Sequence, residues 1–226
     1  MINMENKANR FWLYLIEKKK KIVSKEEVKT NYHEFQSIWK DKEKDFAKIF
    51  DSLRKTRIKY IFNKKWYILT KEEFDDLKNN KFEEYELIFK FLKDQKIPHY
   101  VGLTSAKYLN KLTWQSLKVI YIINSEFKLK RKMGNMKIEL IKFPKELIIN
   151  LALKETTKGI PYSDMEKTFL DELYYQIHNR KLPLADYNYP ELDIEKIRAY
   201  LVFYSKYKLV KKELMKKLNS EMIKLP

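Results

Sequence analysis

The feature that most constrains the fold is the order of patterns in residues 8–69, where three segments with helical spacing of apolar residues precede two β-favouring runs. In the third segment the apolar residues follow the i, i+3, i+4 and i+7 spacing of one face of an amphipathic helix: Phe46, Ile49, Phe50 and Leu53. The runs 58–62 and 66–69 are separated by three polar residues, a length typical of a hairpin loop. Three helices followed by a hairpin predict a winged helix-turn-helix.

Spacing and capping patterns place the other helices of this region. A first helix is expected over 8–17 from the helical spacing of its apolar residues. Ser24 with Glu27 forms a capping-box pattern, in which a hydroxyl and a carboxylate satisfy backbone donors at a helix start. We expect a short second helix from there to about Thr30. The same pattern at Thr70 with Glu73, and again at 163 with 166, predicts two further helix starts.

The chain is strongly basic, with 48 Lys and Arg against 31 Asp and Glu and a formal charge of +17. Residues 1–69 hold 18 Lys and Arg and 9 Asp and Glu, so about half of the excess lies in this third of the chain. Polyanions are the expected partners of such a surface. An AT-rich genome, which inflates the use of Lys, Asn and Ile, could also explain the charge. Alternatively, a winged helix could bind only proteins, with its lysines solvated. Both alternatives stay open.

The candidate DNA contacts follow from how a winged helix binds DNA. A recognition helix places polar side chains in the major groove, and a wing places cations on phosphates. The residues expected on the helix are Lys42, Lys44, Lys48, Ser52 and Lys55. The residues expected on the wing are Arg57, Lys59, Asn63, Lys64 and Lys65. Of these, Ser52 and Asn63 are the ones that could contact bases.

The predicted class is α+β, with an N-terminal winged helix-turn-helix over 1–70, a connecting helical segment over 71–97 and a mixed α/β domain over 98–226. The last domain should hold a small sheet flanked by helices. Helices are expected over 104–112 and 163–178, and one or two over 194–218. Strands are expected over 117–123, 136–142 and 147–153, with Gly134 and Asn135 as a turn and 179–190 as a loop.

Several kinds of site lack the residues they need. The chain has no Cys, its three His are scattered, and Gly102, Gly134 and Gly159 are isolated. Thiolate chemistry, a metal site, a Gly-rich phosphate loop and a cofactor are therefore not expected. No apolar run approaches the roughly 20 residues of a bilayer span, and no signal-peptide core is seen in 1–10, so we expect a cytoplasmic protein. Trp39 and Trp66 are expected to pack rather than to stack on bases.

Two segments of the last domain, YVGLTSAKYLNKL at 100–112 and YSDMEKTFLD at 162–171, resemble the AbiEi antitoxins of type IV toxin-antitoxin systems. In that family a helix of the form Y-x-S-x-x-S-A-L-x-x-H-G-L opens the antitoxin domain, and a P-E-K-T-L-L-D helix closes its sheet. The hairpin also fits the family, with 53–58 preceding 66–69. Asn110 and Lys111 stand where the family has His and Gly, and Met165 replaces the Pro.

The resemblance implies a repressor of its own operon, whose C-terminal domain counteracts a nucleotidyltransferase-like toxin without forming a lasting complex. The implied partner is double-stranded promoter DNA with inverted repeats, bound by a monomer or a weak dimer, and no membrane is involved. A regulator without a toxin partner stays open as an alternative.

A second hypothesis is an enzyme whose C-terminal domain modifies a toxin or a nucleotide with the acidic residues of 163–178. These are Asp164, Glu166, Asp171 and Glu172. The structural explanation is that acidic residues favour the first turn of a helix, and that Lys167 and Asp171 form an i, i+4 pair. Burial separates the two explanations. Catalytic Glu166 and Asp171 would line a cleft, whereas structural ones would be buried and paired with Lys.

Overall fold

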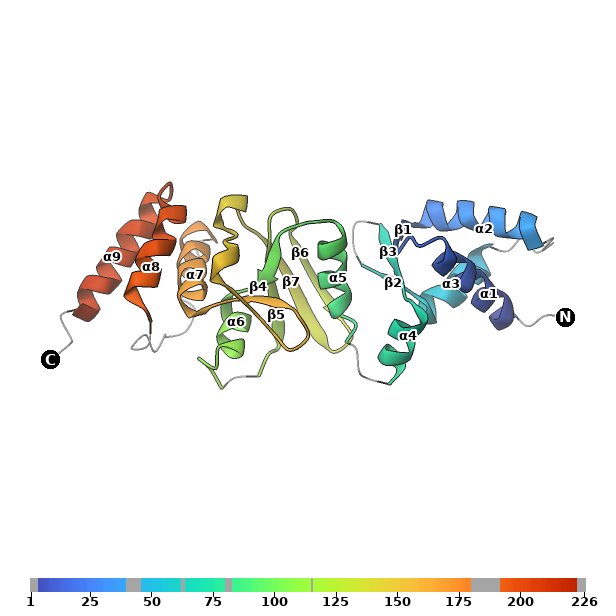
Figure 1. Cartoon of the computed structure of the whole chain (residues 1–226), viewed down its shortest axis with the longest axis horizontal. Coiled ribbons are helices and arrows are strands. Elements are labelled where there is room, and N and C mark those ends of the chain that lie inside the picture. The colour runs from blue at the N-terminus through green and yellow to red at the C-terminus, as the bar shows by residue number, and fades with distance from the viewer. Residues whose placement is uncertain are drawn as a thin grey trace. The chain divides into compact units, whose positions relative to one another are not determined.

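The computed structural model describes residues 4–39, 46–61, 64–79, 83–114, 116–179 and 192–222. The chain combines helices with β-sheets and divides into two compact units, Met1–Asp94 and Gln95–Pro226 (Figure 1). The predicted mixture of helix and strand is therefore confirmed. Within the described ranges, no helix is long and apolar enough to cross a membrane.

The first unit interleaves three helices with a small antiparallel sheet. The elements are α1 Met4–Glu17, β1 Ile22–Ser24, α2 Lys25–Trp39, α3 Phe46–Thr56, β2 Ile58–Tyr60 and β3 Lys65–Ile68. β3 lies between β1 and β2 and is antiparallel to both. Two further helices, α4 (Lys71–Lys78) and α5 (Glu86–Asp94), belong to the same unit and lie in the segment predicted as a connector.

The start of α2 carries the capping box predicted from the sequence. Glu27 N donates to Ser24 Oγ at 3.1 Å, and Ser24 N donates to Glu27 Oε2 at 2.6 Å. These two bonds satisfy backbone donors that the first turn of a helix leaves without partners. β1 therefore passes directly into α2.

The predicted end of α2 near Thr30 is wrong, because the helix continues to Trp39. Val28, Tyr32 and Phe35 extend its apolar face at i, i+4 and i+7, and all three are buried. The ring of Tyr32 packs edge-on against Phe11 of α1 with centroids 5.1 Å apart. Tyr32 and Phe35 thus lie on the buried face of α2 rather than in a loop.

The second capping box, at the start of α4, is also confirmed. Thr70 and Glu73 exchange both of the expected bonds. The Glu73 carboxylate also accepts from the Tyr67 hydroxyl at 3.0 Å and from Lys90 Nζ at 2.6 Å. One carboxylate therefore joins α4 to β3 and α5 within the first unit.

The second unit is built on a mixed six-stranded sheet in the order β6-β7-β5-β4-β9-β8. Its strands are β4 His99–Val101, β5 Val119–Asn124, β6 Leu129–Met133, β7 Met136–Lys142, β8 Leu153–Glu155 and β9 Pro161–Ser163. The pairs β5–β7 and β4–β9 are parallel and the others antiparallel. The helices are α6 Leu103–Leu109, α7 Met165–Asn179, α8 Ile194–Leu201 and α9 Lys208–Met222, with a 3₁₀ turn, η3, at Val202–Tyr204.

α7 is the central helix of this unit, and it contacts α6, β9, α8 and α9 (Figure 1). Its apolar residues Phe169, Leu170 and Leu173 join the main core cluster of the unit. Between β4 and α6 the chain passes very close to β5, where a Cβ on Gly102 would lie 2.4 Å from the Ile123 side chain. A glycine is therefore required at that crossing unless Ile123 moves.

The strand predicted over 147–153 is wrong. The segment instead forms two 3₁₀ turns, η1 (Lys145–Leu147) and η2 (Asn150–Ala152), and β8 begins only at Leu153. Leu147, Ile149 and Ala152 are buried whereas Leu151 is 88% exposed, so the run is apolar without alternating as a strand would. A short apolar run does not by itself separate a strand from a buried turn.

The third predicted capping box, at Ser163 with Glu166, is also wrong. Asp164 caps α7 instead, because Lys167 N donates to Asp164 Oδ1 at 2.8 Å. Ser163 still belongs to β9, and its Oγ lies 2.7 Å from Thr168 Oγ1. The N-cap is therefore Asp164 rather than Ser163, and the helix begins at Met165, one residue later than the pattern predicted.

Candidate functional site

The exposed side of α3 carries the first group of candidate contacts. Ile49 and Leu53 are fully buried, which turns the opposite side of the helix to solvent. On that side Lys48 and Lys55 are exposed, and Ser52 between them is half-buried. These three residues follow i, i+4, i+7 spacing, so they form one line along the helix surface.

Asp51 lowers the positive charge of this surface. Its carboxylate pairs with Arg54 at 2.6 Å and with Lys55 at 3.1 Å. Hydrogen bonds from Lys55 and Arg54 hold the Asp51 pKa below its usual value, so the carboxylate stays charged. The exposed side of α3 is therefore cationic, and the charge of Asp51 near its middle is balanced by Arg54 and Lys55.

The turn between β2 and β3 carries the second group. Lys64 is exposed and has φ of +59°, a left-handed conformation that favours Gly or Asn. A side chain with Cβ costs about 1–2 kcal/mol in that conformation. Lys65 follows at the start of β3, half-buried, and Ile61 N donates to Lys65 O at 3.0 Å to close the turn.

Arg57 lies at the base of the hairpin, where Leu69 N donates to its carbonyl oxygen at 3.0 Å, but its side chain packs against aromatic rings. It sits between α3 and β2, with its guanidinium 4.4 Å from the Trp12 ring centroid and 3.5 Å from that of Phe74. One of its nitrogens, Nη1, is buried without a hydrogen-bond partner, and Nη2 reaches Asn9 Oδ1 at 3.4 Å. The Arg57 guanidinium therefore packs within the first unit, and Arg57 is not included among the proposed DNA contacts.

The remaining candidates are more scattered. Lys59 lies on β2 with its side chain only 19% exposed, and its Nζ is 3.8 Å from Glu84 Oε1. Lys42, Lys44 and Asn63 lie outside the described residues, as does the side chain of Trp39. Trp66 packs edge-on against both Phe50 and Tyr60, in agreement with the packing role predicted for it. The structure thus brings together Lys48, Ser52 and Lys55 on α3, with Lys64 and Lys65 at the hairpin turn.

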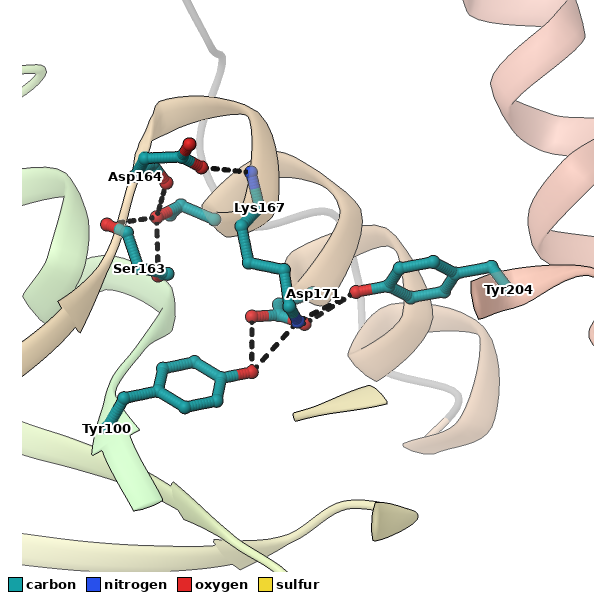
Figure 2. A network of polar contacts seen from close by, with 7 residues as sticks. Tyr100, Ser163, Asp164, Lys167, Asp171 and Tyr204 are labelled. Carbon is teal, nitrogen blue, oxygen red and sulfur yellow. Dashed lines mark hydrogen bonds and ion pairs between the residues drawn. The ribbon is translucent and has the colours of Figure 1, made fainter. Parts of the chain in front are cut away.

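A buried polar network occupies the second unit, and its extent could not be predicted from the sequence (Figure 2). Lys167 and Asp171, one turn apart on α7, form the ion pair that their i, i+4 spacing predicted, and both side chains are fully buried. Tyr100 from β4 donates to Asp171 Oδ2 at 2.7 Å, and Tyr204 from η3 donates to Asp171 Oδ1 at 2.8 Å. Lys167 Nζ also lies 2.9 Å from each hydroxyl oxygen.

This arrangement satisfies every donor of the ammonium group. A lysine ammonium has three N–H donors, and here three oxygens accept from it, one carboxylate and two hydroxyls. Burial raises the pKa of Asp171 and lowers that of Lys167, and the opposite charge of each partner works against these shifts. The network is closed, with no side-chain surface exposed at either charged group.

The same helix attaches the C-terminal helices through further polar contacts. The Tyr200 hydroxyl of α8 donates to Asp164 Oδ2 at 2.9 Å. The Glu166 carboxylate accepts from Asp193 N at 3.0 Å, and its Oε2 lies 3.8 Å from Lys196 Nζ. These contacts and the one from Tyr204 fasten α8 and η3 to α7.

The enzyme hypothesis required Glu166 and Asp171 to line a cleft, and the structure places both inside. Glu166 is 2% exposed and Asp171 is fully buried, each with a lysine beside it. In the part of the chain that the structure describes, no group of three or more His, Cys, Asp or Glu is placed to hold a metal ion. These two carboxylates therefore act as structural partners here.

A second buried ion pair lies next to the network. Lys107 Nζ of α6 is 3.0 Å from Glu172 Oε2, but neither carboxylate oxygen accepts a well-aligned hydrogen bond. Burial raises the pKa of Glu172 to about 7, and the nearby Lys107 reduces that shift. Burial also lowers the pKa of Lys107. Near neutral pH this carboxyl is thus close to half protonated.

Glu172 should make the stability of the second unit fall as the pH rises from 4.5 to 7. The unfolded chain releases this proton near 4.5, whereas the folded chain keeps it until about 7, so raising the pH favours unfolding. The contribution over this window is about 3 kcal/mol. In Glu172→Gln, urea unfolding followed by circular dichroism should show a flatter pH profile. The exposed Glu195→Gln is the matched control, and an unchanged slope in Glu172→Gln would contradict this assignment.

Comparison with known proteins adds little to this geometry. No family model matches the sequence, and no curated protein matches it. The solution structure of the antibiotic-resistance factor ANT(2'')-Ia aligns with a TM-score of 0.31 at 11% identity, covering 60% of this chain and 91% of that one. A likeness at this level supports no conclusion about fold or activity.

Proposed function

We propose that the chain is a DNA-binding transcriptional regulator whose first unit is a winged helix-turn-helix. The proposal is supported by the order of the elements, α1, β1, α2, α3, β2 and β3, with β3 between β1 and β2 in the sheet. In this fold α3 is the recognition helix and the β2–β3 hairpin is the wing. The predicted domain boundary at residue 70 then falls between β3 and α4.

The observation that carries the proposal is the position of the cations on this helix and hairpin. Lys48 and Lys55 lie in line on the exposed side of α3, and Lys64 is exposed at the turn of the hairpin. Cations at these two places would contact phosphates, and Ser52, which lies between Lys48 and Lys55 on α3, would face the bases. Lys64 adopts a left-handed conformation at this turn, which Gly or Asn would adopt with less strain.

We further propose that the regulator belongs to the AbiEi-like type and acts as an antitoxin on its own operon. The two segments that resemble this family form β4 with α6, and β9 with α7, which are adjacent in the second unit. A nucleotidyltransferase-like toxin would then be encoded beside this gene. Its expression should arrest growth, and co-expression of this chain should restore growth. Arrest that continues in the presence of this chain would contradict the antitoxin role.

The regulatory role is tested by titrating the full chain against a labelled duplex from the region upstream of its own gene. A scrambled duplex of the same composition is the control. We expect binding to the upstream duplex at least about 1,000-fold tighter at physiological salt, since specific sites exceed non-specific DNA by this factor or more. Equal affinity for the two duplexes would contradict sequence-specific regulation.

A further inference from the structure

A second basic surface lies in the second unit, on the hairpin formed by β6 and β7. Residues 128–142 hold five lysines and one arginine against a single acid, Glu139. Lys130 and Lys132 alternate along the edge strand β6, Lys128 lies just before it, and all three are exposed. Alternate residues of a strand are about 6.8 Å apart, so Lys130 and Lys132 are separated by about this distance on one side of the sheet.

The end of this hairpin carries a like-charge pair. Lys132 of β6 lies directly opposite Lys137 of β7, next to the Met133–Met136 pair that closes the turn. Like charges directly opposite each other destabilise a sheet. Both lysines are exposed, and no carboxylate of the described residues pairs with either, whereas Lys130 pairs with Glu139 at 2.9 Å.

Edge-strand protection accounts for only part of this pattern. Lysines on an edge strand discourage pairing with another chain, which explains those on β6. β7 is not an edge strand, because it lies between β6 and β5. Lys137 therefore adds repulsion without protecting an edge, and an anion placed between Lys132 and Lys137 would relieve that repulsion.

We propose that the β6–β7 hairpin is a second contact surface for the phosphate backbone of duplex DNA, in addition to α3 and the wing. This inference rests on the DNA-binding function proposed above. Exposed lysines at 128, 130 and 132, with Lys137 opposite the last of them, suit a polymer of phosphates better than a single small anion. The turn residues Gly134 and Asn135 are exposed and carry no apolar side chain, so the hairpin lacks the apolar tip that would enter a membrane surface.

The test compares full-length Lys132→Gln/Lys137→Gln with Lys211→Gln/Lys212→Gln, in which two exposed lysines of α9 are replaced for the same change in net charge. Binding to a labelled duplex is measured by fluorescence anisotropy over a range of KCl concentrations. In the hairpin variant, the slope of log K against log[salt] should decrease by about two and the affinity at low salt by at least about 10-fold. The α9 variant should keep the wild-type slope. Thermal unfolding of the hairpin variant should be no easier than that of wild type, since the like-charge pair is gone.

The outcomes separate this inference from the proposed function. If wild type shows no salt-dependent binding to duplex DNA, the proposed function fails and this inference fails with it. If wild type binds and the hairpin variant keeps its slope, only the hairpin inference is overturned. It is also overturned if both variants lose affinity for the duplex equally. Binding to phosphatidylserine vesicles is measured in parallel, and a hairpin variant that loses vesicle binding but keeps its affinity for the duplex overturns the inference as well.

Discussion

Replacing Lys167 by methionine should lower the free energy of unfolding of the second unit by about 3–5 kcal/mol at neutral pH, because removal of one partner leaves a buried charge uncompensated. Asp171 would keep only the hydroxyls of Tyr100 and Tyr204 as partners. Urea-dependent hydrogen exchange of peptides from α7 measures the change in that unit. With Lys167 gone, burial would keep the Asp171 carboxyl protonated at low pH, so the loss should grow as the pH rises.

A second variant separates the lost charge balance from a simple packing defect. Lys167→Met/Asp171→Asn removes both charges and leaves an amide that can still bond the two hydroxyls, so it should recover most of the lost stability. A milder change, Tyr204→Phe, should cost about 1–3 kcal/mol because it leaves one ammonium donor without an acceptor. A double variant as unstable as Lys167→Met would contradict the network described here.

Much of the first unit could be predicted because its signals are local. The spacing of Ile49, Phe50 and Leu53 located α3, and the patterns at 24–27 and 70–73 located two helix starts. Three-residue strands such as β1, β4 and β9 carry too few residues for alternation to be seen, and they form only because neighbouring strands pair with them. Arg57 was predicted as a wing contact, because its sequence neighbours do not show the Trp12 and Phe74 rings against which its guanidinium packs.

The buried network shows the limit of sequence patterns more clearly. The i, i+4 spacing predicted the pairing of Lys167 with Asp171, but the same spacing is usual on exposed helices. Its burial depends on Tyr100 and Tyr204, which lie 67 and 37 residues from Lys167 in the chain. The basic hairpin differs, because the density of lysines in 128–137 was visible in the sequence and only its placement on an edge strand was not.

The largest effect on DNA binding is expected from Lys48→Gln/Lys55→Gln/Lys64→Asn, which removes three cations from α3 and the hairpin turn. Asparagine is chosen at 64 because it tolerates the φ of +59° found there. If each lysine contacts one phosphate, affinity for duplex DNA should fall by about 100-fold or more. The matched control is Lys71→Gln/Lys78→Gln/Lys93→Gln, which removes three exposed lysines from α4 and α5 in the same unit.

DNA recognition by α3 and the β2–β3 hairpin is tested most directly by the slope of log K against log[salt], measured for these two full-length variants and wild type on one duplex. The variant of α3 and the hairpin should lose about three from the magnitude of the slope, at roughly 0.9 for each phosphate contact. The control on α4 and α5 should keep the wild-type slope. Equal slopes for all three proteins, or an equal decrease in both variants, would contradict DNA recognition by α3 and the β2–β3 hairpin.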